Sequence, residues 1–221
     1  MLAFQLASLG PAWAAAQSGD GRAGGWLFRA GFNEWAPSVR SGELGVPNTP
    51  GARVNLRPNS QVFVGLTYLL NESWAVDVPL TLPFSNELEG AGATKDVGVL
   101  ATVQTQPLSV LLRHRWAPMY GVFRPYVAAG PSYVRMEGAQ PTKALTALGL
   151  AGSGQAPTVR AESKWAPTFG AGLTYDYNQQ IFFELSVMKT LVSTRLSFSG
   201  GQRVDVDVDP MVFSTSVGWR F

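Results

Sequence analysis

Eight ionisable residues lie in segments whose side chains otherwise alternate between apolar and small polar types. All eight occupy the polar positions of that alternation, so they share one face of each segment. Charged side chains enclosed by protein persist when they are paired and hydrogen-bonded. We therefore predict a structural ion-pair network rather than a catalytic site, made of Arg29, Asp77, Arg113, Arg115, Arg124, Asp176, Glu184 and Arg220.

Residues that could carry nucleophilic catalysis are few. The chain has no cysteine and a single histidine, His114. A nucleophile needs a base and an orienting group within hydrogen-bond reach. The spacing of serine, histidine and acidic residues along the chain indicates no such triad. The even position of His114 groups it with the apolar side chains of its segment. The sequence therefore predicts that the protein is not an enzyme and needs no cofactor.

Asp205, Asp207 and Asp209 alternate along the chain and would present three carboxylates on one face of an extended segment. Oxygen ligands of this kind can hold a divalent cation. The same pattern describes a solvated sheet edge, which is the reading we favour. The triplet is therefore only a weak metal candidate, and we predict no metal site.

The composition narrows the class of protein. The 221 residues suit one domain; 46% are hydrophobic and only 14% are charged, against roughly 25% charged in soluble domains. The net charge is +2, and no run of lysine or arginine forms a basic stripe, so we predict no nucleic-acid partner.

The first residues are typical of a secretory signal. Met1 to Gly10 is largely apolar, and two small-x-small patterns, at 12–14 and 14–16, are cleavage candidates. No lysine or arginine precedes Arg22, which departs from the usual pattern and leaves a buried N-terminal helix as the alternative. We predict a signal peptide at 1–16, with cleavage near 14–16, and a single domain at 17–221.

Alternation with period two indicates β-strands. In the stretch from Gln61 to Leu70, for example, every even position is large and apolar. Several predicted strands contain a proline, which is tolerated near strand ends or bulges. The predicted strands are 24–36, 60–70, 74–84, 105–116, 122–136, 163–177, 181–198 and 203–221.

The predicted connections alternate in length. Short links at 71–73, 117–121 and 178–180 alternate with long ones at about 37–59, 85–104 and 137–162, the last containing a candidate helix at 142–150. An up-and-down sheet puts odd and even connections at opposite ends, so one end is tight and the other carries loops. Bacterial outer-membrane barrels have short periplasmic turns and long outer loops.

Aromatic side chains sort by strand end in the same way. Membrane–water interfaces favour amphipathic rings, whereas the aromatic core of a soluble sandwich would not sort them. We predict an interfacial girdle at the short-turn end, and a less regular set at the loop end formed by Trp35, Phe84, Tyr133, Trp165 and Phe198. The short-turn girdle comprises Trp26, Tyr68, Trp74, Trp116, Phe123, Tyr175, Tyr177, Phe183, Trp219 and Phe221.

These patterns predict an all-β fold: an eight-stranded antiparallel up-and-down transmembrane β-barrel in the bacterial outer membrane. The apolar face would meet lipid and the polar face would pack the lumen, which in so small a barrel is nearly filled or admits one slender ligand. Small lumenal glycines would leave space for a ligand or for larger neighbours, or would allow strand curvature.

Several stretches resemble the OmpW family of eight-stranded outer-membrane barrels, in matching order along the mature chain. One departure is Thr105-Gln106-Pro107-Leu108, where the family usually has a His-Leu-Pro-Pro-like run. The matching stretches are GLTYLLNESWAVDVPLTLPF (65–84), FRPYVAAGPSYV (123–134), KWAPTFGAGLTYDY (164–177), VDVDPMVFSTSVGWRF (206–221) and, more weakly, WLFRAGFNEWAP (26–37).

The resemblance implies a narrow, rather hydrophobic channel that passes small hydrophobic molecules across the outer membrane and releases them sideways into it. Val134, Trp165 and Met188 are the expected channel rim. The alternatives are a structural or adhesive barrel without transport and, less favoured, a lipid-modifying enzyme. The expected partners are outer-membrane lipid and a small hydrophobic ligand.

The chain ends in VGWRF. The pattern places Val217, Trp219 and Phe221 on the lipid face. Chains ending this way resemble clients of the outer-membrane barrel assembly machinery, so we expect Phe221 to act as an assembly signal.

Overall fold

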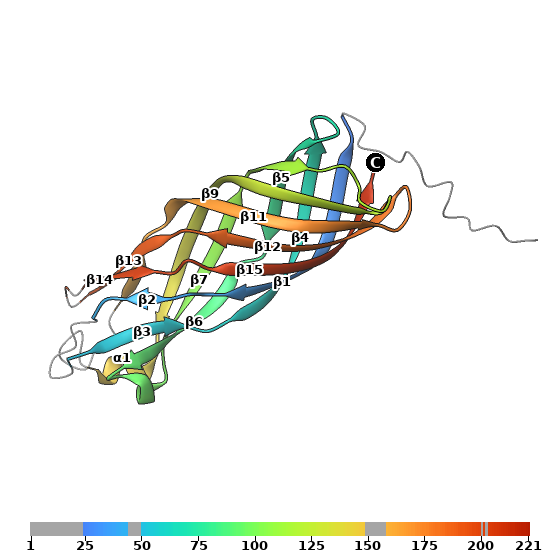
Figure 1. Cartoon of the computed structure of the whole chain (residues 1–221). Coiled ribbons are helices and arrows are strands. Elements are labelled where there is room, and N and C mark those ends of the chain that lie inside the picture. The colour runs from blue at the N-terminus through green and yellow to red at the C-terminus, as the bar shows by residue number, and fades with distance from the viewer. Residues whose placement is uncertain (1–23, 44–49, 149–157, 200, 202) are drawn as a thin grey trace, which may run out of the picture.

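The computed structural model describes residues 24–43, 50–148, 158–199, 201 and 203–221 (Figure 1). The predicted signal peptide at 1–16 lies outside this part of the chain. The described elements are β1 (Trp26–Ala36), β2 (Arg40–Ser41), β3 (Ala52–Leu56), β4 (Asn59–Leu69), β5 (Trp74–Thr81), β6 (Phe84–Gly92), a 3-10 turn (Lys95–Val97), β7 (Val99–Ser109), β8 (Leu111–Arg115), β9 (Phe123–Pro141), α1 (Lys143–Ala147), β10 (Val159–Ala161), β11 (Lys164–Asp176), β12 (Ile181–Thr190), β13 (Ser193–Phe198), β14 (Arg203–Asp207) and β15 (Met211–Arg220).

Eight of these strands close into a ring. The order is β1–β4–β5–β8–β9–β11–β12–β15, and β15 pairs back onto β1. Every pairing is antiparallel and joins strands that are consecutive in the up-and-down path. The predicted eight-stranded antiparallel barrel is confirmed.

The short connections gather at one end of the barrel, and the C-terminus lies at the same end (Figure 1). At the other end the strands continue into regions that we expected to be loops. There β3, β6 and the first half of β7 extend the main sheet, while β10, β13, β14 and β2 form a four-stranded sheet. The expected loops at 37–59, 85–104 and 137–162 are therefore partly strand, and the barrel continues beyond the lipid-facing band.

This extension was missed because its alternation is inverted. In β6, Phe84, Asn86 and Leu88 point inward, while Ser85 and Glu87 point outward or lie at the surface. In β14, valines point inward and charged residues outward. Water surrounds this part of the wall, so its outer face is polar and its inner face apolar. Within the lipid-facing band the outer face is apolar, with exposed Phe32, Val62, Val64, Leu66, Leu80, Leu112, Leu185 and Phe213.

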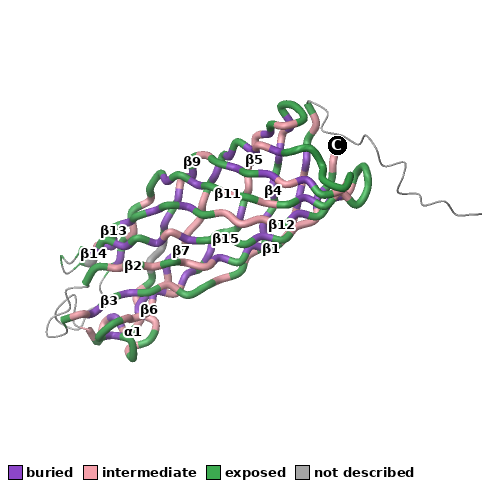
Figure 2. Tube along the Cα trace, in the orientation of Figure 1, coloured by how far each residue is buried: buried purple, intermediate pink, exposed green. Residues whose placement is uncertain are grey.

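Burial follows the pleat of each strand: buried and exposed positions alternate along the tube in Figure 2. Two of the strand prolines lie at irregularities of the sheet, where proline is tolerated. Pro79 sits where the partner of β5 changes from β8 to β7, and Pro167 accepts a hydrogen bond from Leu191 in the break between β12 and β13. No helix in the described ranges is long and apolar enough to cross a membrane.

Aromatic side chains of the predicted short-turn girdle pack against one another. Trp26 packs on Tyr68 with ring centroids 4.8 Å apart, and Phe123 packs on Tyr175 at 5.3 Å. The prediction of an aromatic girdle at the loop end is wrong for two residues: Trp35 and Phe84 point into the interior and pack on each other. Tyr133 and Trp165 do form an outer-face pair, at 5.3 Å. The side chain of Phe198 lies outside the described part of the structure. The candidate helix at 142–150 is present as α1, capped by the Thr142 hydroxyl.

Inward-facing glycines make room for large lumenal side chains. Gly218 lies opposite Phe182 on the neighbouring strand, and a Cβ atom at Gly218 would overlap the Phe182 ring. In the same way, a Cβ atom at Gly172 would overlap the Tyr126 ring, and one at Gly65 would overlap the Arg29 side chain. At these positions the glycines accommodate larger neighbours rather than a ligand.

We therefore expect Gly218→Ala to lower the free energy of unfolding by about 1–3 kcal/mol, because overpacking forces a shift of the ring or of the backbone. Denaturant unfolding of the barrel in detergent measures this loss. In a Phe182→Ala background the same change should cost almost nothing. An equal loss in both backgrounds would show that the Phe182 ring is not the cause.

Candidate functional site: a layered barrel interior

The upper interior, at the loop end, is an apolar cavity. The inverted alternation of the extension places aliphatic side chains on its wall from seven strands. The space open to the centre of a water molecule is only about 50 Å³, so the cavity suits a slender apolar molecule. Its lining includes Trp35, Leu56, Leu88, Val103, Val134, Met136, Val192, Leu196, Val206 and Val208.

A second cavity of about 40 Å³ lies directly below the first. The two share Pro107, Thr190 and Val212 in their walls, so they are adjacent along the axial path of the interior. Hydroxyl groups line this level: Ser109 and Ser132 lie 2.6 Å apart, and Thr168 and Thr190 lie 2.8 Å apart. A 2.5 Å contact between Ser132 and Thr168 joins the two pairs. The interior thus changes from apolar to polar with depth.

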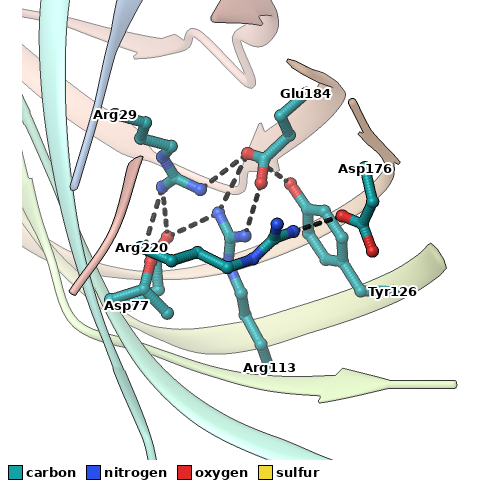
Figure 3. A network of polar contacts seen from close by, with 8 residues as sticks. Arg29, Asp77, Arg113, Tyr126, Asp176, Glu184 and Arg220 are labelled. Carbon is teal, nitrogen blue, oxygen red and sulfur yellow. Dashed lines mark hydrogen bonds and ion pairs between the residues drawn. The ribbon is translucent and has the colours of Figure 1, made fainter. Parts of the chain in front are cut away.

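Four charged side chains close the lower end of this path (Figure 3). Arg29 donates from Nη2 to both carboxylate oxygens of Asp77, at 2.8 and 2.7 Å, and from Nη1 to Oε1 of Glu184 at 2.6 Å. Arg113 donates to the same two carboxylates, at 2.9 Å to Asp77 and 2.8 Å to Glu184. We call Arg29, Asp77, Arg113 and Glu184 the ionic quartet; all four are buried.

Neutral groups complete the ionic quartet. The Thr67 hydroxyl donates to Asp77 at 2.6 Å, and the Tyr126 hydroxyl donates to Glu184 at 2.9 Å. The Arg113 guanidinium also lies 4.1 Å from the centre of the Tyr126 ring. Buried charges are stable only when attraction and hydrogen bonds offset the loss of hydration, and here both carboxylates receive several donors.

The register of the strands brings these residues to one level. Thr67 lies opposite Asp77 on β4 and β5, and Arg29 lies opposite Gly65 on β4. Because Gly65 has no side chain, the Arg29 guanidinium crosses that space toward β5. The quartet therefore joins β1, β5, β8 and β12 across the lumen.

The remaining members of the predicted network lie nearer the short turns. Arg220 pairs with Asp176, donates to the carbonyl of Asn178 at 3.1 Å, and lies 4.8 Å from the centre of the Phe182 ring. Arg115 and Arg124 are also buried and lumenal, but neither forms an ion pair with any residue in the described ranges. The eight charges thus separate into a quartet, a pair and two arginines.

The three residues expected at the channel rim lie in three different places in the structure. Val134 lines the upper cavity. Met188 also faces inward, but it lines the lower cavity rather than the rim. The expectation that Trp165 lines the rim is wrong: Trp165 is 71% exposed, and its neighbour Ala166 is the buried residue. The odd position of Trp165 on β11 puts it on the outer face beside Tyr133, where it cannot line the channel.

The aspartate triplet lies on the outer face of the loop end. Asp205 accepts from Nε of Arg195 at 2.7 Å, and this hydrogen bond and charge lower the pKa of the Asp205 carboxyl. Asp207 is exposed. Within the described ranges, no group of three or more acidic or histidine side chains is arranged to hold a metal ion.

His114 belongs to the aromatic girdle. Its ring lies 4.7 Å from that of Trp74 and 4.9 Å from that of Trp116. These neighbours cover the imidazole on the outer face of the barrel.

The predicted network left out the neutral members of the interior. Tyr126 and Thr67 complete the ionic quartet, and Asn33 lines the lower cavity with its side-chain oxygen buried and unpaired among the described groups. All three stand at inward positions of strands that were predicted, so strand parity would have found them. The predicted network contained charged residues only and therefore did not include them.

Comparison with known protein families places residues 22–221 in one described as the OmpW family. The chain belongs to the OmpW family. It is 24% identical to the dibenzothiophene metabolism operon protein PahQ of Pseudomonas aeruginosa over 200 residues, covering 89% of this chain and 88% of that protein. It is 25% identical over 202 residues to outer membrane protein W of Escherichia coli K12, covering 90% and 89%.

Solved structures agree on the fold. The crystal structure of the outer membrane protein OprG from Pseudomonas aeruginosa superposes with a TM-score of 0.78 at 23% identity, covering 90% of this chain and 97% of that one. This OmpW-family protein is therefore an integral protein of the bacterial outer membrane, and its apolar outer band contacts lipid. In outer-membrane barrels the short turns face the periplasm and the longer loops face outward.

Proposed function

We propose that this OmpW-family barrel passes small hydrophobic molecules from the outside into the outer membrane. The observation that carries the proposal is the apolar upper cavity, which lies in the water-surrounded extension of the barrel and adjoins the lower cavity. An apolar molecule leaves water on entering it, and burial of apolar surface favours that transfer by roughly 25 cal/mol per Å². The relative PahQ is named as a dibenzothiophene metabolism operon protein, which supports the same class of compound.

The exit that we propose runs sideways through the wall. The ionic quartet lies across the lumen below the lower cavity, so a straight apolar path to the periplasm would cross four charged groups. Phe63 and Thr81 line the lower cavity and also an apolar groove on the outer face. The wall is weakly paired beside them, because β5 joins β7 only at Leu80 and Leu108. A modest opening here would connect the cavity with lipid.

Two features support a channel rather than an enzyme. His114 faces outward and packs between tryptophan rings, away from both cavities. Both carboxylates of the ionic quartet are shared by its two arginines, which suits a structural role. We also propose that the barrel assembly machinery recognises Phe221, whose exposed ring lies beside the seam where β15 meets β1.

Entry of dibenzothiophene into whole cells tests the proposal. An intact outer membrane resists apolar solutes, so cells lacking the protein should take up the compound more slowly than cells expressing it. Uptake can be measured as consumption at low concentration in a strain able to degrade the compound. Equal uptake in both strains, with the protein folded in the outer membrane, would contradict the proposal.

A further inference from the structure

Three arginines and one aspartate meet inside the barrel at its short-turn end. Arg115 on β8 lies opposite Tyr126 on β9, and Arg124 precedes Tyr126 by two residues on the same face. Arg124 lies opposite Thr174 on β11, and Asp176 follows Thr174 by two residues. Arg220, on β15, reaches Asp176 across β12. The four side chains therefore follow one another around the periplasmic mouth.

Arg115 and Arg124 are enclosed without a counter-charge. They are 5% and 9% exposed, and Nη1 of Arg115 and Nε of Arg124 are buried nitrogens without a hydrogen-bond partner among the described groups. Among the described side chains, Asp176 is the lumenal carboxylate beside them in the strand register, and it already binds Arg220. The next carboxylates, Asp77 and Glu184, are shared by Arg29 and Arg113.

Two uncompensated cations in an enclosed mouth are costly, because a buried charge loses hydration and these two also repel each other. Neither can become neutral, since arginine keeps its proton in proteins. An anion that entered from the periplasm and lay between them would offset both costs.

We propose that Arg115 and Arg124, with Arg220 beside them, form an oxyanion-binding site in the periplasmic mouth of the barrel, and that its ligand is a phosphate group. Guanidinium groups bind phosphate through two parallel hydrogen bonds. The low exposure of both arginines admits a small group rather than a protein surface. The phosphate can come from free inorganic phosphate or from a phospholipid headgroup of the inner leaflet.

The chain itself offers one rival counter-ion. Asp20 is the only acidic residue of the sequence outside the described part of the structure. If Asp20 compensated these arginines, the folded protein would bind no phosphate until that residue was changed. The Asp20→Asn variant therefore separates an internal counter-ion from an external ligand.

Titration of the full-length barrel with inorganic phosphate tests the site. In maltoside detergent micelles, which contain no phosphate, and at constant ionic strength, we expect saturable binding by calorimetry and a rise in melting temperature that chloride does not reproduce. Arg115→Gln and Arg124→Gln should each weaken phosphate binding by about tenfold or more, as expected when one partner of a buried charge pair is removed. Arg203→Gln, an exposed arginine at the loop end, is the matched control and should bind like the parent.

The stability of the same variants gives a readout independent of binding. Because Arg115 has no described partner, Arg115→Gln should fold and be at least as stable as the parent in phosphate-free buffer. Nanodiscs containing phosphatidylglycerol distinguish the two sources: competition with inorganic phosphate identifies the headgroup as a ligand, and lack of competition identifies the free anion. Phosphate binding that survives both substitutions, or binding that appears only in Asp20→Asn, would overturn the proposal.

Discussion

Replacing Asp77 with asparagine should lower the free energy of unfolding by about 3–5 kcal/mol, the usual cost of removing one partner from a buried charge pair. Asparagine preserves the shape of the side chain, so little of the loss comes from packing. The carboxylate accepts from Arg29 through both oxygens, from Arg113 and from Thr67. Without its charge, two buried guanidinium groups would depend on Glu184 alone.

The matched control for this prediction is Asp205→Asn. Asp205 makes the same kind of bond to one arginine, Arg195, but that pair is exposed on the outer face of the loop end, where water solvates both groups. We expect a much smaller loss for such a pair, because exposed ion pairs contribute little to stability. Denaturant unfolding in detergent measures both losses, with the folded fraction detected by the heat-modifiable gel mobility of the barrel. Similar losses for the two variants would mean that the quartet contributes no more than an exposed pair.

The quartet also bears on transport. Asp77→Asn leaves an excess positive charge across the lumen, which should still oppose a straight apolar path. We therefore expect dibenzothiophene uptake to persist in those Asp77→Asn barrels that do fold. This separates a role of the quartet in stability from a role in transport.

Period-two alternation was enough to predict the ring of eight strands because lipid imposes a clear rule on its outer face. In the stretch from Val62 to Leu66, the even positions are apolar and exposed to lipid, whereas Phe63 and Gly65 between them face the lumen. Above the lipid-facing band the surroundings are water and the rule reverses. The same alternation then places Phe84 and Trp35 inside, which is why their assignment to a girdle was wrong.

The sequence predicted which charges point into the lumen but not which of them pair. Pairing depends on the register between strands and on which inward neighbours are small, as with Gly65 beneath Arg29. These relations join residues that are far apart in sequence, such as Arg29 and Glu184. Without the register, Arg113 and Arg115 look equivalent, although one is fully paired and the other has no described partner.

Trp165 shows a simpler error. It was expected both in the loop-end aromatic set and at the channel rim, but its odd position on β11 makes it face outward, so it belongs only to the aromatic set. On the neighbouring strand, Val134 occupies the inward position at the same level. Strand parity therefore decides which residues can contact a substrate, whereas residue type does not.

Replacing Val134 with tryptophan should reduce dibenzothiophene uptake to the level of cells without the protein. Val134 is 3% exposed and lines the upper cavity, and an indole in its place would fill the small open space there. Overpacking should cost about 1–3 kcal/mol of stability, so the amount of folded barrel in the outer membrane must be measured in parallel.

The matched control is Tyr133→Trp, which introduces the same side chain one residue earlier on the same strand. Tyr133 faces outward and packs on Trp165, so this variant leaves the cavity open and uptake should match the parent. If Val134→Trp folds to parental levels and uptake is unchanged, the substrate does not pass through the upper cavity. If both variants lose uptake equally, the loop end as a whole, rather than the cavity within it, controls entry.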